Sequence, residues 1–157
     1  MEHAEVMNNC DAKAQRVGLA QLSWAEQMIV LVSRANFEIE LGGLDAFYYN
    51  SAGDEAAPTV AALEAVGATH AASTLRAANS LFPGGSPPRS RERRFDALVD
   101  VRRLANGPLA SLEREVGRDE PDVFSRLCAF IDAHREELRD LGVDGQPSDS
   151  SCERASK

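Results

Sequence analysis

Residues 23–43, SWAEQMIVLVSRANFEIELGG, decide the fold of this chain. Ser23 and Glu26 have the spacing of a capping box, in which each side chain accepts a hydrogen bond from the other residue's backbone amide. Apolar residues then recur at helical spacing on one face: Trp24, Met28, Leu31, Ala35 and Ile39. Others lie off that face, namely Ile29, Val30 and Phe37. The stretch therefore predicts a long central helix over 23–41, covered by neighbours on more than one side.

Glycine and proline divide the rest of the chain into further helices. Gly42 and Gly43 end the central helix, because glycine readily adopts the left-handed conformation after a last helical turn. A short helix over 44–49 and a turn-rich loop at 50–54 follow. More helices are predicted over 58–66, 69–81, 95–105, 110–116 and 121–141. No segment alternates like a strand, so we predict an all-α fold, a single compact domain of about six or seven helices with a buried central helix.

Composition sets the expected domain limits. A chain of 157 residues suits one domain. Residues 1–20 are polar and lack a strong apolar stripe, so we expect an N-terminal polar segment before a helical domain over 21–142. Residues 143–157 consist mainly of Ser, Asp, Gly and other polar types, which predicts a disordered tail.

The cysteines fit no metal or redox spacing: Cys10, Cys128 and Cys152. We interpret Cys128 as a core residue and the other two as bystanders near the termini. Free thiols of this kind are typical of a reducing compartment. The acidic N-terminus leads into no apolar segment, so no signal peptide is expected and the predicted location is cytoplasmic.

The charge balance is acidic, with 17 basic and 25 acidic residues and a net charge of −8. Such a chain is repelled by the phosphates of nucleic acid and by anionic lipids, so neither is expected as a direct partner. The longest strongly apolar run, 28–32, is far shorter than the roughly 20 residues that span a bilayer.

Catalytic motifs are missing from the sequence. There is no phosphate-binding or dinucleotide-binding glycine motif, and the three histidines stand in separate segments. We therefore predict no catalytic residue, no metal site and no cofactor, and we do not expect an enzyme. An enzyme would need a cleft with convergent polar groups and a titratable residue of perturbed pKa.

One carboxylate, Glu38, falls near the apolar face of the predicted central helix. A charge there is costly unless it is hydrogen-bonded. The candidate donors are the backbone amides of residues 42–44 and the side chain of Asn50. We interpret Glu38, Gly42, Gly43 and Asn50 as a structural corner.

Acidic residues concentrate after the central helix. No Lys or Arg occurs between Arg34 and Arg76, whereas the following carboxylates do: Glu40, Asp45, Asp54, Glu55 and Glu64. Carboxylates about 5–6 Å apart on a helix can resemble a row of phosphates. We predict that these five residues form an interaction surface. Two alternatives stay open: the charges serve only solubility, or those at helix starts serve the helix dipole.

Two segments resemble a known family. Residues 38–50, EIELGGLDAFYYN, resemble the signature Glu-Val-x-Asn-Gly-Gly-Phe-x-Gln-Phe-x-x-Asn of the bacterial DNA-mimic-protein-like domain family, and residues 62–68, ALEAVGA, resemble its Ala-Leu-x-x-Ile-Gly-Ala segment. Leu41 and Ala46 depart from the signature. The resemblance extends over about residues 20–140 and implies an acidic, all-helical fold. For the family's namesake it implies binding to DNA-binding proteins by imitation of the phosphate backbone.

Two functions fit these observations. The first is a non-enzymatic acidic interaction domain that binds a basic DNA-binding protein as a DNA mimic. The second is a helical adaptor or immunity-type protein that neutralises a protein partner by shape and aromatic surface. The basic run at 89–94, RSRERR, argues against a mimic that is acidic on every side. Salt separates the two, because only the mimic's affinity falls steeply with ionic strength. The oligomeric state is left open.

Overall fold

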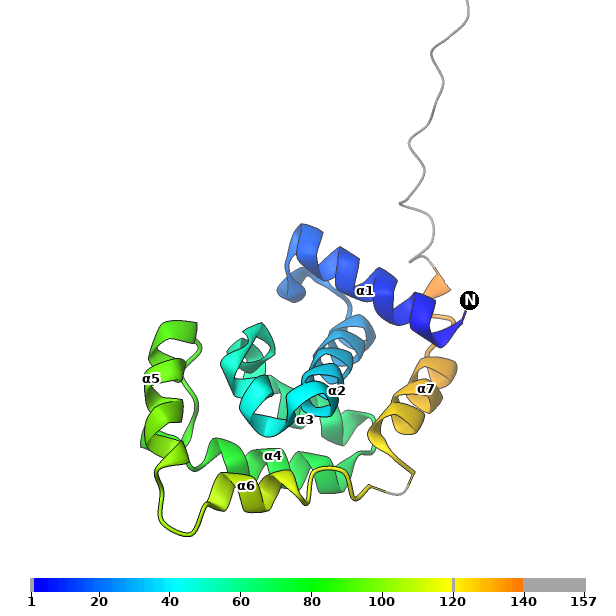
Figure 1. Ribbon diagram of the computed structural model, residues 1–157. Coiled ribbons are helices and arrows are strands. Elements are labelled where there is room, and N and C mark those ends of the chain that lie inside the picture. Colours follow the sequence, from blue (N-terminus) through cyan, green and yellow to red (C-terminus); the bar gives the residue numbers. More distant parts are fainter. Residues whose placement is uncertain (1, 120, 140–157) are drawn as a thin grey trace, which may run out of the picture.

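The computed structural model describes residues 2–119 and 121–139, and within them the chain is helical (Figure 1). The helices are α1 (His3–Val17), α2 (Trp24–Tyr49), α3 (Ala56–Ala65), α4 (Thr69–Asn79), α5 (Arg91–Arg102), α6 (Pro108–Glu113) and α7 (Val123–Ala133). Short 3-10 turns occur at Leu19–Gln21, Ser51–Glu55 and Pro83–Gly85. This described part contains no strand, and the predicted all-α single domain is confirmed.

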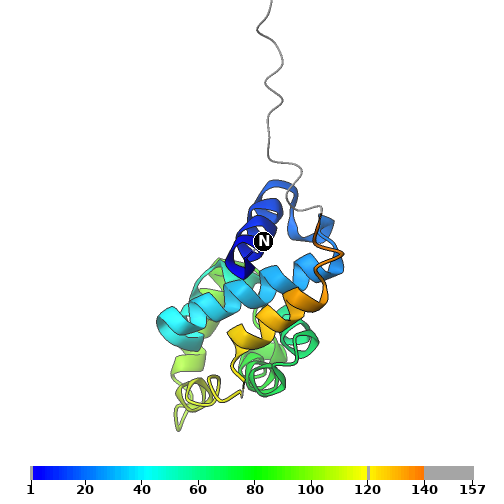
Figure 2. The same cartoon turned by 90° about the vertical axis from the view of Figure 1, so that its right-hand side faces the viewer.

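Helix α2 is the centre of the molecule. Helices α1, α3, α5, α6 and α7 all pack against it, and Figure 2 shows it crossing the molecule with α1 above and α7 in front. Its residues 28–32 are buried all round. The predicted capping box is present, because Ser23 Oγ accepts from the Glu26 amide and a Glu26 carboxylate oxygen accepts from the Ser23 amide at 2.7 Å. The expectation of a buried central helix is thereby confirmed.

The predicted break at the glycine pair is also present. Gly42 (φ −156°, ψ 23°) and Gly43 (φ 72°, ψ −167°) leave the helical conformation, so α2 consists of two helical segments that meet at a kink. The dihedral angles of Gly43 lie in a region that essentially only glycine adopts. This kink turns the short segment 44–49 out of line with the rest of α2.

Most of the N-terminal polar segment, for which the sequence shows no strong apolar stripe, forms a helix that packs against the rest of the fold. Helix α1 packs against α2 and α7 and buries Val6, Cys10 and Ala14. These residues are spaced four apart, which is one narrow stripe of small side chains and hence a weak sequence signal. Cys10 is fully buried and Cys128 only half-buried, the reverse of the prediction. Cys152 and the predicted tail at 143–157 lie outside the described residues.

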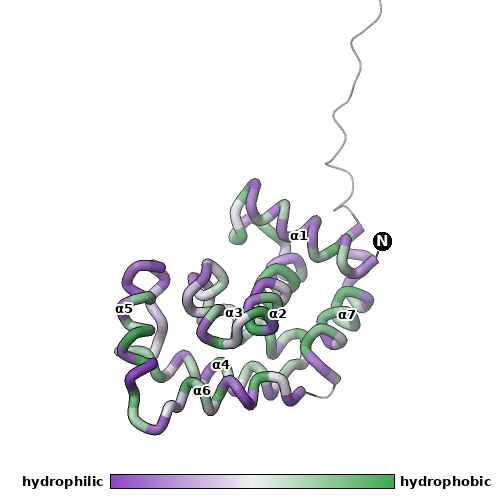
Figure 3. Tube along the Cα trace, viewed as in Figure 1, coloured by the Kyte–Doolittle hydropathy of each residue, from purple (hydrophilic) through white to green (hydrophobic). Residues whose placement is uncertain are grey.

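Several aromatic side chains are exposed, among them Trp24, which the sequence placed on the apolar face of the central helix. Trp24 is 54% exposed and Phe124 49%, and each lies in the first turn of its helix. The Trp24 ring nevertheless meets Phe130 edge to face at 5.7 Å. Phe95 is 42% exposed. Figure 3 shows hydrophobic residues along α2 and α7, and many of these residues are buried in the core. None of the described helices combines the length and apolar composition that crossing a membrane requires.

Some helix boundaries also shift. Helix α5 begins at Arg91, earlier than predicted, because Ser90 caps it and accepts from the Arg93 amide at 3.5 Å. Pro108 opens α6, since proline suits a first helical turn. Helix α7 ends at Ala133, although Leu138 beyond it is still buried.

Candidate interaction surface around the α2 kink

Arg94 is the least expected residue of the site. Its side chain is fully buried, and all five guanidinium N–H donors are used. Nε donates to Tyr48 O at 2.6 Å. The two terminal nitrogens donate to four further acceptors: Pro88 O, Arg89 O and Asn50 O at 2.9 Å each, and Asp54 Oδ1 at 2.6 Å. The guanidinium therefore ties the start of α5 to the segment that follows α2.

Gly53 makes room for this arginine. A Cβ at Gly53 would lie 2.7 Å from Arg94 Nε and 2.8 Å from the backbone oxygen of Phe47. A backbone neighbour cannot move aside as a flexible side chain can, so only glycine fits here. The sequence did hold a signal for this contact: Arg94 shares the buried stripe of α5 with Leu98 and Val101.

The five predicted surface carboxylates do not form an unpaired acidic surface. Asp45 makes two bonds of 2.6 Å to Arg102, Asp54 contacts Arg94 at 2.6 Å, Glu55 contacts Arg89 at 2.6 Å, and Glu64 pairs with Arg76. Glu40 instead accepts from the Asn36 side chain at 2.8 Å. The gap in basic residues along the sequence is not a gap in space, because α5 and the residues before it bring arginines back to this corner. The expected acidic patch is thus largely neutralised.

The rest of the basic run also packs against the corner. Arg91 donates to Tyr49 O at 3.1 Å, and its guanidinium lies 5.5 Å from the centre of the Tyr49 ring. Phe95 meets the same ring edge to face at 5.6 Å. Asp45 raises the pKa of the Arg102 guanidinium above its ordinary value, chiefly through their hydrogen bond. The role of residues 89–94 that the sequence left open is structural at Arg94 and charge-compensating at Arg89.

At the kink itself, Glu38 accepts a hydrogen bond of 2.7 Å from the Asn50 side chain. Glu113 of α6 approaches from the other side: its carboxylate occupies the space beside Gly43, where a Cβ would lie 1.4 Å from Glu113 Oε1. Within the described part of the chain, neither of these carboxylates nor Glu40 forms an ion pair. The kink therefore gathers acidic groups that the arginines do not reach.

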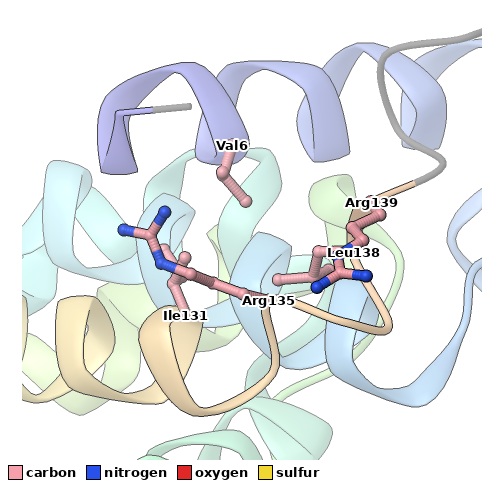
Figure 4. A pocket seen from close by; sticks show the side chains of 5 residues that line it. All are labelled: Val6, Ile131, Arg135, Leu138 and Arg139. Carbon is pink, nitrogen blue, oxygen red and sulfur yellow. The ribbon is translucent and has the colours of Figure 1, made fainter.

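A separate pocket of about 260 Å³ lies between α1 on one side and α7 with the turns that follow it on the other (Figure 4). Val6, Ile131 and Leu138 make its apolar walls, and the stems of two arginines complete it. Both guanidinium groups pair with acids three residues earlier, Arg135 with Asp132 at 2.7 Å and Arg139 with Glu136 at 2.6 Å. The pocket holds no acid–base pair.

The side chains that could act in catalysis or bind a metal, such as the Cys10 thiol and the His134 imidazole, are constrained by their surroundings. Burial, with a smaller effect of Glu26, raises the pKa of the Cys10 thiol to about 12, and a protonated thiol is a poor nucleophile. His134 stacks on Phe130 at 4.0 Å and its Nδ1 is bonded to the Phe130 carbonyl at 2.8 Å. Among the described residues, no three His, Cys, Asp or Glu side chains are grouped so as to hold a metal ion.

Comparison of the sequence with known protein families identifies one family that matches this chain. The family model described as DMP19-like protein matches residues 20–134, a range that includes the kink, the arginine-paired corner and most of the core. No curated protein and no solved structure matches the chain. The matched range is well over half of the 157 residues. The chain therefore belongs to the DMP19-like protein family, in agreement with the resemblance of residues 38–50 and 62–68 to DNA-mimic-protein-like domains.

Proposed function

We propose that this chain is a non-enzymatic protein-interaction domain that binds a basic, DNA-binding protein as a DNA mimic. The observation that carries the proposal is family membership over residues 20–134 in a chain whose net charge is −8. Excess carboxylates attract the same basic surfaces that bind phosphates, and they accelerate encounter at low salt.

The placement of unpaired charge supports the proposal. Glu92, Asp96 and Asp100 are exposed, are spaced four residues apart on α5, and form no ion pair in the described part of the chain. Neighbours at this spacing are about 5–6 Å apart on a helix surface, which is a row of negative charge. Together with the carboxylates of the kink, this row supplies negative charge that the corner's arginines do not cancel.

The test begins with affinity capture from the native host and identification of the captured protein. The purified partner is then titrated with this chain in the presence of the partner's own DNA duplex. A mimic competes with the duplex, and its affinity falls steeply when salt rises from about 50 to 200 mM. Simultaneous binding of chain and duplex, or an affinity insensitive to salt, contradicts the proposal.

A second function, the helical adaptor or immunity-type protein, is favoured by one observation. Phe37 is 63% exposed and Leu41 70%, more than any other large hydrophobic residue of the described part. Exposed apolar groups of this size mark contact surfaces in many proteins. An adaptor that binds through them leaves the partner's DNA site open, so duplex competition separates the two functions.

A further inference from the structure

The flank of α2 that precedes the kink carries two uncovered apolar side chains. Phe37 and Leu41 are four residues apart and therefore lie on the same side of the helix. Their exposed fractions, 63% and 70%, mean that no helix of the described fold covers them. This flank of α2 is an unpartnered helix face.

A groove runs beside this face, between α1 and α2. Its volume is about 380 Å³, and Phe37 is one of the residues that line it. On the α1 side Met7, Ala12 and Gln15 line it, and the ion pair of Arg34 with Asp11 at 2.6 Å crosses between the two helices. Met7, Ala12 and Phe37 give the groove apolar surface, polar side chains such as Ser33 line the rest, and its two charges are paired with each other. An apolar side chain of a partner can therefore enter it without facing an uncompensated charge.

The charge around the apolar pair is negative. Glu38, Glu40 and Glu113 surround the kink and form no ion pair in the described part of the chain. By contrast, Asp45, Asp54 and Glu55, which follow the kink in the chain, are neutralised by the arginines of α5 and of the loop before it. The unpaired carboxylates therefore lie beside the exposed apolar residues.

We propose that this surface docks an amphipathic helix of a partner protein, with apolar side chains flanked by Lys or Arg. We call the surface the kink patch; it consists of Phe37, Glu38, Glu40, Leu41 and Glu113. The apolar side of the partner helix contacts Phe37, Leu41 and the groove, as amphipathic helices commonly do. Its basic flanks meet the carboxylates. The proposal rests on the proposed function in one respect, that the partner is basic, and it adds where and how the partner binds.

Charge decides against a second copy of this chain as the occupant. In a symmetric dimer the same patch of both copies meets at the interface, so the carboxylates of one copy would lie near those of the other. Like charges facing one another oppose such a contact, whereas a basic amphipathic helix satisfies both the apolar and the acidic part. The occupant is therefore a partner of opposite charge.

The probe is a synthetic helical peptide of Leu and Lys with an apolar stripe, and its comparison is a permuted peptide of the same composition without the stripe. Binding to the full chain is measured by calorimetry at low salt. We expect the striped peptide to bind about tenfold more tightly than the permuted one. The double variant Phe37→Ser/Leu41→Ser should lose about tenfold in affinity for the striped peptide, the effect of removing a central apolar contact.

The matched control is Phe124→Ser/Leu104→Ser, which removes an exposed aromatic side chain from α7 and an exposed leucine from the turn after α5, both outside the kink patch. This variant should bind within about twofold of the parent chain. Far-UV circular dichroism verifies that both variants are folded. Amide chemical shifts of the parent chain provide a measurement without any variant, and the peptide should shift residues 37–43 and the groove side of α1.

Equal binding of the two peptides, equal losses in both variants, or shifts centred away from the kink patch would each overturn the inference. The proposed function fails separately. If this chain competes with DNA for the native partner, but Phe37→Ser/Leu41→Ser binds that partner as tightly as the parent chain, DNA mimicry is supported and the kink patch is not the docking site. If the striped peptide binds at the kink patch, but the native partner binds the duplex and this chain at the same time, the docking surface is supported and DNA mimicry is contradicted.

Discussion

The side chain of Asn50 donates a hydrogen bond of 2.7 Å to the carboxylate of Glu38, and this bond closes the α2 kink across 12 residues. Both residues are half-buried. The predicted brace thus uses the Asn50 side chain as its donor. Glu38→Gln keeps an oxygen that can accept this bond, whereas Glu38→Ala removes it at a cost of about 1 kcal/mol. Urea unfolding of the two variants measures the difference, and equal midpoints for Gln and Ala would show that the bond contributes nothing.

Replacement of Arg94 should be among the most destabilising changes in the chain. Arg94→Ala removes the guanidinium that donates to four backbone oxygens and to Asp54, and breaking a buried charged network of this kind costs about 3–5 kcal/mol. Arg94→Lys should recover only part of this, because an ammonium cannot reproduce the planar fork. Its exposed neighbour is the control: Arg93→Ala should change the free energy of unfolding by less than about 0.5 kcal/mol.

Gly43→Ala tests the kink in two ways. The φ of 72° is unfavourable for alanine, which costs about 1–3 kcal/mol, and the new Cβ would collide with the Glu113 carboxylate. The double variant Gly43→Ala/Glu113→Ala relieves the collision but not the backbone strain. We therefore expect the double variant to be more stable than the sum of the single changes implies. Additive free energies of unfolding would mean that Glu113 moves aside at no cost.

The central helix and its kink were predictable because their signals are local. Ser23 and Glu26 are three residues apart, the apolar run 28–32 is continuous, and the glycine pair is adjacent. The packing of α1 against α2 was not predicted, because its buried residues Val6, Cys10 and Ala14 are small and separated mostly by polar residues. A stripe of small side chains gives little hydrophobic contrast, although it allows close packing of two helices.

The interaction surface was less predictable, because ion pairs join distant parts of the chain. Arg102 is 57 residues from Asp45 and Arg94 is 40 from Asp54. Counting charges along the sequence cannot detect such partners. The exposure of Trp24 likewise depends on where a helix end protrudes from the fold, which periodicity does not encode.

Alkaline pH should destabilise the fold through Cys10. Its pKa is raised from 9.0 to about 12, chiefly by burial. Below pH 9 the thiol is protonated in both states and adds no pH dependence. Between pH 9 and 12 the unfolded thiol ionises while the folded one keeps its proton, so stability falls with pH by up to about 1.4 kcal/mol per unit. Cys10→Ala should show a shallower decline in urea unfolding above pH 9, and an unchanged slope would contradict this assignment. Burial raises the pKa of Tyr48 too, so part of the decline persists in the variant.

Single charge reversals should separate the acidic residues that build the fold from those that are free to bind a partner. Asp54→Lys places a cation against the fully buried guanidinium of Arg94, now 2.6 Å from the aspartate oxygen, so it should strongly lower the free energy of unfolding. Glu40→Lys removes only a hydrogen bond from Asn36 on an exposed surface and should change stability by less than about 0.5 kcal/mol. A combined reversal that includes Asp54 is therefore unsuitable as a binding test, because it is expected to damage the fold. Thermal unfolding ranks the two variants, and the salt dependence of partner binding is then compared for Glu40→Lys alone. Equal stability of the two variants would mean that the Arg94–Asp54 pair does not hold the corner.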